Sequence, residues 1–375
     1  MIDFHGIKLK NPLIIAASPA TEAVKNVKKC AKAGAGAVIL KSMGTEGVIY
    51  ASKYCPRRMV FKDGVLYMQS SSRREILDMK RGISLIKNCK ESVDIPIIAS
   101  VSGQYENLED WEELCEKAAE AGADMIQIDT FYCVGLGNYV DESTFNDLIS
   151  MSEDIQEKIG KPVIIKITPN VHVQIAAKVL KNRKIGVSLL DSLPVGVPLD
   201  IYSSNYSIFR GVKQHGKCLA AGKILFPLSL FYTQTLYRSG VGHICAGGGI
   251  FNANNALSLL ISGAKAVQIA TVVCVYGFSI ISKILTDLDR ITNHYTNIDR
   301  LRADFHKLIG NETIAIDGRV VRKEVECRMC NDPLCENPIM CGDREKGCEG
   351  CGICIDVCPH RKARFVPLKS QQEVI

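Results

Sequence analysis

The chain has 375 residues, of which 47% are hydrophobic and 23% are charged, and its formal net charge is +6. This composition is typical of a globular protein, and the length exceeds one ordinary domain. The basic residues are scattered, apart from a short cluster at 360–364, so the charge argues against a nucleic-acid-binding protein. We interpret that cluster as a solvated edge or as a docking edge for an acidic partner.

No signal for export or membrane insertion is evident. The N-terminal residues, MIDFHGIKLKNP, lack a basic segment followed by an apolar run, so a signal peptide is not indicated. The longest apolar run, at 264–281, is interrupted by charged, polar and glycine residues and predicts no membrane span. The chain has 16 cysteines, and free thiols without a targeting signal predict a reducing, cytoplasmic location.

A short β-branched run, a loop and an amphipathic segment recur up to about Gly277. The runs are continuously apolar, as expected for strands buried on both faces of a parallel sheet. Eight strands are expected, at 13–17, 37–41, 95–101, 125–130, 163–168, 186–191, 243–246 and 266–271. Eight strands that alternate with helices predict an α/β fold of the (β/α)8 TIM barrel type. An open doubly wound sheet is the alternative, but no strand–Gly-x-Gly-x-x-Gly–helix unit favours it.

Helices are expected between the strands, at 108–121, 142–159 and 254–262, and after the barrel, at 297–309. Several expected helices end at a glycine, which suits the left-handed conformation that closes a helix. Two strand-to-helix connections, at 42–74 and 192–227, are unusually long. Because both leave the C-terminal ends of strands, where barrel active sites lie, we expect them to form lids or substrate loops.

Polar side chains stand at the C-terminal ends of four apolar strands. They are Lys41, Asp129 with Thr130, Lys166, and Asp191 with Ser192. A buried lysine costs desolvation energy unless it faces an anion or an electron-rich ligand. A single lysine is more often part of a structural salt bridge, but two lysines from different strands at the catalytic end favour a ligand site.

Glycines follow the seventh strand, in the run Ala246-Gly247-Gly248-Gly249-Ile250. Glycines there let backbone N–H groups approach a phosphate, and the loops after the last two strands form the usual phosphate site of a barrel. A tight turn that needs glycine φ angles is the simpler explanation. Three consecutive glycines exceed what such a turn requires, so we expect a phosphate-bearing cofactor.

The segment from Cys327 to Pro359 holds eight of the 16 cysteines. Its second half has the spacing C-x2-C-x2-C-x3-C-P, with which bacterial ferredoxins ligate a [4Fe–4S] cluster. Its first half, C-x2-C-x4-C-x5-C, offers four more thiolates to a second cluster or to a structural zinc ion. The eight candidate ligands are Cys327, Cys330, Cys335, Cys341, Cys348, Cys351, Cys354 and Cys358. We therefore expect a barrel domain over 1–310 and a ferredoxin-like iron–sulfur domain over 311–375. A phosphate-bearing cofactor joined to an electron-carrying tail indicates flavin mononucleotide (FMN).

Several short stretches carry a resemblance. They are Lys10-Asn11-Pro12, 16–21, Leu40-Lys41-Ser42, Pro56-Arg57, 98–101, 166–170, Gly248-Gly249-Ile250 and Val267-Gln268-Ile269. Together these stretches resemble the dihydroorotate dehydrogenase superfamily over about 2–291, most closely the flavin barrel of dihydropyrimidine dehydrogenases. Pyrimidine-reducing relatives couple this barrel to ferredoxin-like clusters. The first three tail cysteines resemble cluster ligands of the flavoprotein partner in that family, which favours two [4Fe–4S] clusters over zinc.

The resemblance implies which residues would bind FMN. Lys41 and Lys166 would contact the flavin ring. The phosphate would be held by Gly222, Lys223, Gly248, Gly249, Ala270 and Thr271. Ala17, Ser18 and Ser42 are the remaining cofactor positions that the resemblance implies.

The catalytic acid or base is predicted in the loop after the fourth strand. The family's signature there is Asn-x-Ser-Cys-Pro, with the cysteine opposite the flavin, whereas this chain reads Asp129-Thr130-Phe131-Tyr132-Cys133. Without a gap, Tyr132 takes the catalytic position, and a shift by one residue restores Cys133. Either side chain can transfer a proton. Cys133 is our choice, and a small buried hydrophobe is the alternative explanation for it.

The substrate positions depart from the family. The asparagines that grip the pyrimidine are replaced by Asp129 and Ser192, with Arg73 in the first long loop. A carboxylate only accepts and a guanidinium only donates hydrogen bonds, so a site altered in this way should reject uracil and suit a charged substrate.

The resemblance implies an FMN- and iron–sulfur-dependent oxidoreductase acting on a CH–CH bond of a dihydropyrimidine-like substrate. No nicotinamide site is indicated, so the redox partner would be an NAD(P)H-oxidising flavoprotein subunit or a ferredoxin. A homodimer is a further expectation, from analogy alone. The alternatives are an electron-transfer subunit without substrate turnover, a dihydroorotate dehydrogenase, and a zinc-stapled scaffold.

Overall fold

The computed structural model describes residues 1–45, 59–69, 76–104, 107–131, 139–202, 207–209, 217–294, 298–308, 323–326 and 364–367. The chain divides into two units, Met1–Ile309 and Gly310–Ile375. In the second unit, the described residues form one antiparallel pair, β17 (Lys323–Glu326) with β18 (Arg364–Pro367). The eight predicted cluster cysteines lie outside the described residues, so the iron–sulfur domain stays a prediction.

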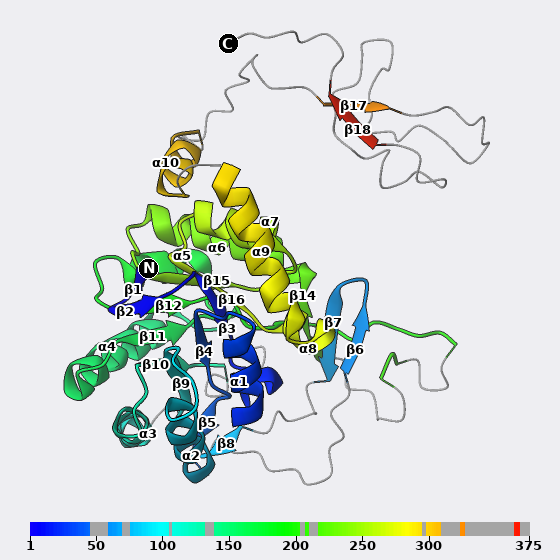
Figure 1. The fold of residues 1–375 in the computed structure, drawn as a ribbon. Helices are drawn as coiled ribbons and strands as arrows, with labels where there is room; N and C mark the ends of the chain where they lie inside the picture. Colours follow the sequence, from blue (N-terminus) through cyan, green and yellow to red (C-terminus); the bar gives the residue numbers. More distant parts are fainter. Residues whose placement is uncertain are drawn as a thin grey trace. The chain divides into compact units, whose positions relative to one another are not determined.

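Eight parallel strands close into a barrel in the first unit (Figure 1). They are β3 (Leu13–Ile15), β4 (Ala37–Ile39), β9 (Ile97–Ser102), β10 (Met125–Asp129), β11 (Val163–Lys166), β12 (Gly186–Ser188), β15 (Ile244–Gly247) and β16 (Ala266–Ile269). Neighbouring strands follow the chain order, and the pairing of β16 with β3 closes the ring. Every residue of these strands is buried, which explains their continuous apolar runs. The predicted eight-stranded barrel is confirmed.

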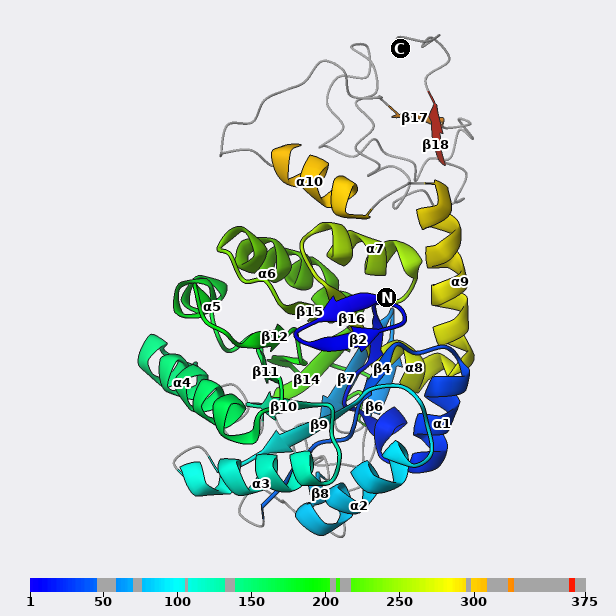
Figure 2. The same ribbon diagram turned by 60° about the vertical axis from the view of Figure 1, so that its left-hand side comes forward.

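Helices surround the barrel (Figure 2). Those between its strands are α1 (Val24–Lys32), α2 (Met79–Lys90), α3 (Leu108–Glu120), α4 (Glu142–Ile159), α5 (Val173–Leu180), α6 (Phe226–Arg238) and α7 (Ala253–Ile261). The last strand is followed by α8 (Thr271–Tyr276), α9 (Ser279–His294) and α10 (Ile298–Leu308). The four expected helices correspond to α3, α4, α7 and α10. As expected, glycines with positive φ follow α1, α3 and α7: Gly34 (100°), Gly122 (97°) and Gly263 (125°).

A hairpin of β1 (Ile2–Phe4) and β2 (Ile7–Leu9) closes one end of the barrel interior. Its Phe4 and Leu9 are fully buried and pack with Ile14, Ile98 and Ile164 from the barrel strands. The interior is therefore a packed core at this end, as in other barrels. The opposite end, at the C-terminal ends of the strands, is left for a ligand.

The two long connections fold together into one antiparallel sheet, which we call the accessory sheet. Its strands are β6 (Met59–Lys62), β7 (Val65–Gln69), β13 (Leu193–Gly196) and β14 (Lys217–Gly222), in the order β13-β14-β7-β6. β7 comes from the first connection and pairs with β14 from the second. Two further short strands, β5 (Met43–Gly44) and β8 (Leu77–Asp78), extend the barrel sheet next to β9.

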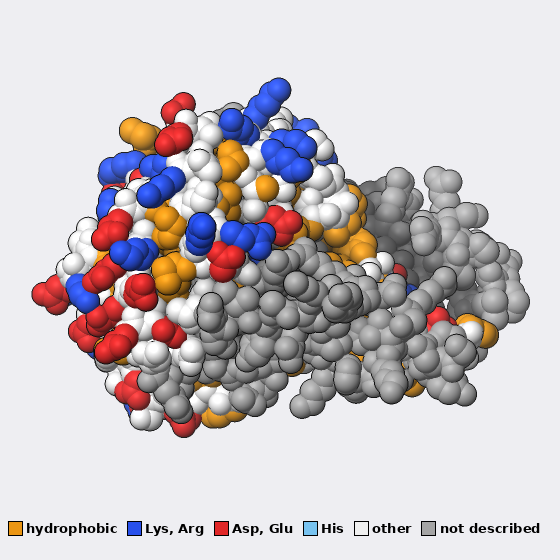
Figure 3. All heavy atoms as spheres, turned by 90° about the horizontal axis from the view of Figure 1, so that it is seen from below, with side chains coloured by type: hydrophobic (Ala, Val, Ile, Leu, Met, Phe, Trp, Pro, Cys, Tyr) orange, Lys and Arg blue, Asp and Glu red, His pale blue; other side chains and the backbone are white. Residues whose placement is uncertain are grey.

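Basic and acidic side chains are intermixed on the face drawn in Figure 3. Ion pairs join neighbouring outer helices; for example, Lys158 of α4 lies 2.5 Å from Glu112 and 2.8 Å from Glu116 of α3. Such exposed pairs stabilise a fold only slightly. Among the described residues, no helix has the length and apolar character needed to cross a membrane.

Candidate active site

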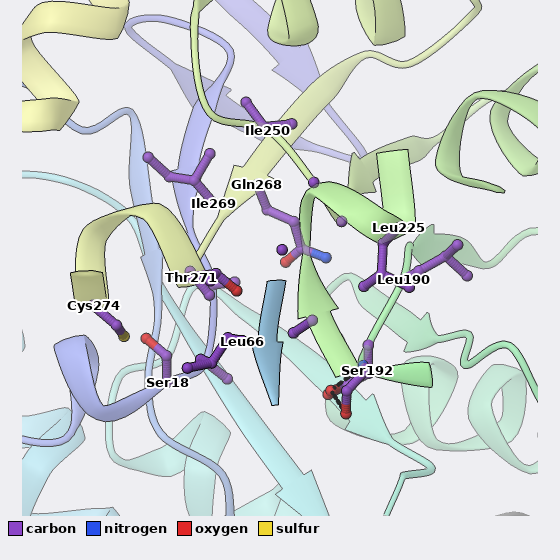
Figure 4. Close-up of a pocket in the computed structure, with 18 of the residues that line it drawn as sticks. Ser18, Leu66, Leu190, Ser192, Leu225, Ile250, Gln268, Ile269, Thr271 and Cys274 are labelled. Carbon is purple, nitrogen blue, oxygen red and sulfur yellow. Dashed lines mark hydrogen bonds between the residues drawn. The ribbon is translucent and has the colours of Figure 1, made fainter. Parts of the chain in front are cut away.

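A cavity opens at the C-terminal ends of the barrel strands. Its lining comes from the ends of the barrel strands, from the loops that follow them and from the accessory sheet. The accessory sheet contributes Met59, Leu66, Met68, Ala221 and Gly222 to its wall. In Figure 4, Ser18 and Thr271 stand on one side of the cavity, Ser192 on the other, and Gln268 and Leu66 between them.

The structure brings most of the predicted cofactor residues around this one cavity. Those that line it are Ala17, Ser18, Lys41, Lys166, Gly222, Gly248, Gly249, Ala270 and Thr271, together with the predicted substrate residue Ser192. Ser42 and Lys223 are not among the lining residues; Ser42 contacts Ser100 and Asp129, and Lys223 contacts Gly64. The predicted residues Arg73, Tyr132 and Cys133 lie outside the described residues.

Lys166 lies between two carboxylates, that of Asp129 on the neighbouring strand β10 and that of Asp191, which follows β12. Its Nζ is 2.5 Å from Asp191 Oδ2 and 3.3 Å from Asp129 Oδ2. Because β10 and β11 pair in register, Asp129 stands directly beside Lys166. Both side chains are nearly inaccessible, with 10% and 1% exposed. A charged pair is stable at such depth only when its partners hold it in place, so the two carboxylates fix the ammonium group at the cavity wall.

Asp191 was predicted only as a polar residue at a strand end, without a role, and the structure makes it a site residue. It lines the cavity, whereas the neighbouring Ser192 donates hydrogen bonds to Asp191 Oδ1 from its backbone N (2.6 Å) and from Oγ (3.0 Å). Ser192 therefore orients the carboxylate. The predicted substrate residue Asp129 does not line the cavity; it lies behind Lys166. The position of Asp191 at a strand end beside Lys166 was the signal that could have found it.

Two glutamines in the barrel strands were also missed. Gln127 of β10 and Gln268 of β16 both line the cavity and are at most 5% exposed. Gln127 Nε2 donates to Ser100 Oγ at 2.9 Å, and Gln268 Nε2 donates to Ser188 Oγ at 2.8 Å. Each amide nitrogen is therefore hydrogen-bonded to a serine of another barrel strand. A polar residue inside an otherwise apolar strand was the available signal.

The glycine run after β15 packs directly against the start of α6. Gly248 and Gly249 have φ angles of 94° and 84°. A Cβ atom on Gly249 would lie 2.5 Å from the backbone N of Phe226. Ser229 Oγ of α6 lies 2.5 Å from the carbonyl oxygen of Gly247 and 2.9 Å from that of Gly248, between which it shares its one hydroxyl proton. The run is thus a fixed backbone surface facing the cavity, as a phosphate site requires.

Lys223 follows Gly222, which lines the cavity. Its backbone N–H donates to Gly64 O at 2.9 Å, and its side chain crosses Gly64, where an added Cβ atom would lie 2.5 Å from Lys223 Cδ. Its Nζ lies 5.6 Å from the ring centroid of Phe251. Gly64, in the turn between β6 and β7, therefore contacts the Gly222-Lys223 segment and helps to fix its position.

We expect Gly249→Ala to lower the free energy of unfolding by more than 3 kcal/mol, roughly the sum of a positive-φ penalty and a backbone clash. The matched control is Gly240→Ala, because Gly240 has a similar φ of 92° but has no atom within 4 Å of an added Cβ. The control should cost only about 1–2 kcal/mol. Urea denaturation of both variants measures the difference. Equal losses would contradict the tight packing of the glycine run against α6.

Five described cysteines of the barrel are buried and structural: Cys30, Cys89, Cys115, Cys218 and Cys245; Cys274 is exposed and lines the cavity. Burial raises the pKa of the Cys30 thiol to about 12 and that of Cys89 to about 11. A thiol with a raised pKa is a poor nucleophile and a poor metal ligand. Within the described residues, no group of three or more His, Cys, Asp or Glu side chains could hold a metal ion.

The sequence model of the dihydroorotate dehydrogenase family matches residues 1–292. The chain belongs to the dihydroorotate dehydrogenase family. Its matched region covers the whole barrel, the accessory sheet and the cavity, so the cavity is the candidate active site of a dihydroorotate dehydrogenase-family oxidoreductase. The resemblance inferred from the short motifs is confirmed.

Relatives in this family include two kinds of protein. The chain is 25% identical to the NAD-dependent dihydropyrimidine dehydrogenase subunit PreA of Escherichia coli, over 78% of this chain and 72% of that protein. It is 27% identical to the catalytic subunit of dihydroorotate dehydrogenase B (NAD(+)) of Thermoplasma volcanium, over 72% of this chain and 86% of that protein. The corresponding subunit of Pyrococcus abyssi is also 27% identical, over 77% and 92%.

Proposed function

We propose that the protein is an FMN- and iron–sulfur-dependent oxidoreductase that acts on a CH–CH bond of a small cyclic, dihydropyrimidine-like substrate. The observation that carries this proposal is the joint placement of Lys41, Lys166 and the glycine run around one cavity. Lysines supply hydrogen-bond donors and positive charge to the carbonyl edge of a flavin. Gly248 and Gly249 line the cavity and pack so closely on the start of α6 that an added Cβ atom would clash with Ser229 or Phe226.

The donor set of the cavity fits FMN. Gly248, Gly249 and the Ala270-Thr271 pair would hold the phosphate, while Lys41 and Lys166 would contact the ring. When bound, FMN would supply two-electron chemistry at a substrate carbon. The apolar residues of the accessory sheet, such as Leu66 and Met68, would exclude water from the same space.

The remaining residues would act on the substrate. Asp191 reaches the cavity and only accepts hydrogen bonds, so we propose that it binds an N–H group of the substrate, with Ser192 holding its carboxylate. Arg73 would pair with an acceptor or with a negative charge. Cys133 would carry the proton of the carbon adjacent to the one that exchanges the hydride, with Tyr132 as the alternative.

The eight tail cysteines would ligate two [4Fe–4S] clusters and connect the barrel to a redox partner. One relative is named as a subunit of an NAD-dependent enzyme, which favours an NAD(P)H-oxidising flavoprotein subunit over a ferredoxin as the partner. A dihydroorotate dehydrogenase is the second candidate, because two of the relatives carry that name.

The test is an anaerobic assay of the purified protein with uracil, dihydrouracil, orotate and dihydroorotate, using a viologen dye as the electron carrier. Turnover of a pyrimidine pair supports the proposal and decides between the two candidates. If reduced clusters bleach the bound FMN but no cyclic amide changes the rate, the protein is an electron-transfer subunit. Zinc without iron or flavin would contradict both redox functions and favour a scaffold.

We expect Cys133→Ala to lower the rate of turnover about 10²- to 10⁴-fold, the usual contribution of a positioned acid or base, and to leave FMN bound. The matched control, Tyr132→Phe, removes the neighbouring hydroxyl and should retain most of the rate. Turnover and flavin absorbance measured on the same samples separate catalysis from binding. The opposite pattern would assign the proton transfer to Tyr132.

A further inference from the structure

One buried amide at the cavity has an oxygen atom for which the described residues offer no partner. Gln127 is 1% exposed, and its Oε1 accepts no hydrogen bond from any described residue. A buried acceptor left unpaired costs free energy comparable to a lost hydrogen bond. Because Gln127 also lines the cavity, a bound ligand is the natural source of the missing donor.

A chain of hydrogen bonds fixes which end of this amide is the acceptor. Ser42 Oγ lies 2.7 Å from Asp129 Oδ2, and an ionised carboxylate can only accept, so the Ser42 hydroxyl donates to Asp129. Ser42 Oγ also lies 3.0 Å from Ser100 Oγ. Since the only proton of Ser42 is already used, Ser100 must donate to Ser42.

The same reasoning reaches Gln127. Ser100 has spent its one hydroxyl proton on Ser42, so towards Gln127 it can only accept. The group of Gln127 that lies 2.9 Å from Ser100 Oγ must therefore be the amide nitrogen. The carboxylate of Asp129, which pairs with Lys166, thus polarises the whole chain and reserves Gln127 Oε1 as an acceptor for a ligand.

We propose that Gln127 Oε1 accepts a hydrogen bond from the N3–H group of the flavin ring, which rests on the proposed FMN function. The pyrimidine edge of an oxidised flavin presents acceptor, donor and acceptor in sequence: C2=O, N3–H and C4=O. The cavity offers donors from Lys41 and Lys166 and, at Gln127, an acceptor that no described residue uses, which is the complementary set. N3–H is the only N–H donor of the oxidised ring, so Gln127 makes this chain selective for a flavin that carries it.

The experiment compares the binding of FMN with that of its N3-methyl analogue by fluorescence quenching of each flavin on the apoprotein. Loss of this hydrogen bond should make the analogue bind about 10- to 100-fold more weakly to the wild-type protein. Gln127→Ala removes the acceptor and makes room for the methyl group, so the preference should fall below about threefold. Gln268→Ala is the matched control, because Gln268 lines the same cavity from β16, and it should retain the preference.

The binding measurements separate a failure of the proposed FMN function from a failure of the Gln127 contact. If neither flavin binds, the FMN function fails and this inference falls with it. If FMN binds but the wild-type protein binds both flavins equally, or if Gln127→Ala keeps the preference, only the role of Gln127 is overturned. A preference lost in Gln268→Ala instead would assign the contact to β16. Ser100→Ala frees the amide to rotate, so an intermediate preference in that variant supports the fixed chain, and an unchanged one contradicts it.

Discussion

Replacing Lys166 by alanine should abolish FMN binding and lower the free energy of unfolding by about 3–5 kcal/mol, the usual cost of breaking a buried ion pair. The substitution leaves the carboxylates of Asp129 and Asp191 without the cation that lies 3.3 Å and 2.5 Å from them. The side chains of Asp129 and Asp191 are only 1% and 12% exposed, so water can replace little of the lost charge. Flavin retention on gel filtration and urea denaturation measure the two effects.

The matched control is Lys178→Ala. Lys178 pairs with Glu142 at 2.7 Å, but its side chain is 70% exposed, so the loss should be below about 1 kcal/mol. The double variant Lys166→Met with Asp191→Asn removes one charge of each sign. It should regain part of the stability but none of the flavin affinity. If Lys166→Ala were as stable as the control, the charged cluster would not support the cavity.

The barrel could be predicted because its strands are buried on both faces. Runs such as Val163–Lys166 are continuously apolar until the last residue, and that pattern is typical of strands buried on both faces of a parallel sheet. The same logic identified Lys41 and Lys166, since a lysine at the end of such a run needs a partner. Burial on both faces therefore allowed the fold and the position of the site to be predicted from the same pattern.

The accessory sheet could not be predicted, because its central pairing joins distant segments. β7 (Val65–Gln69) pairs with β14 (Lys217–Gly222) across the intervening barrel strands, and no local pattern encodes that contact. Only its hairpin carried a local signal: Asp63-Gly64 has φ angles of 53° and 79°, and Asp-Gly is a frequent two-residue hairpin turn.

The sequence also could not show which of several nearby polar residues faces the cavity. Asp191 and Ser192 both follow β12, and only the structure shows that the carboxylate faces Lys166 while the serine holds it. Asp129 and Gln127 illustrate the same limit on β10, where the residue nearer the strand end lies behind Lys166 and the deeper one lines the cavity. Side-chain orientation at a barrel rim depends on neighbouring strands, so it is not a local property.

The iron content of the protein is the second property for which we expect a large effect. The anaerobically purified protein should contain about eight irons, as two [4Fe–4S] clusters need. In two-cluster ferredoxins, the fourth cysteine of each run ligates the other cluster. The predicted ligand sets are therefore Cys327, Cys330, Cys335 with Cys358, and Cys348, Cys351, Cys354 with Cys341. Two self-contained sets of four are the alternative.

Paired substitutions distinguish these two arrangements. With crossed ligands, Cys348→Ala with Cys341→Ala removes two ligands from one cluster and should leave about four irons. Cys348→Ala with Cys358→Ala would then damage both clusters and leave almost none. Self-contained sets predict the reverse result for the two pairs. Cys245→Ala is the control, because Cys245 is fully buried in the barrel interior and its loss should leave the iron content unchanged. A wild-type protein that holds zinc instead of iron would contradict both arrangements and leave the barrel without its electron carrier.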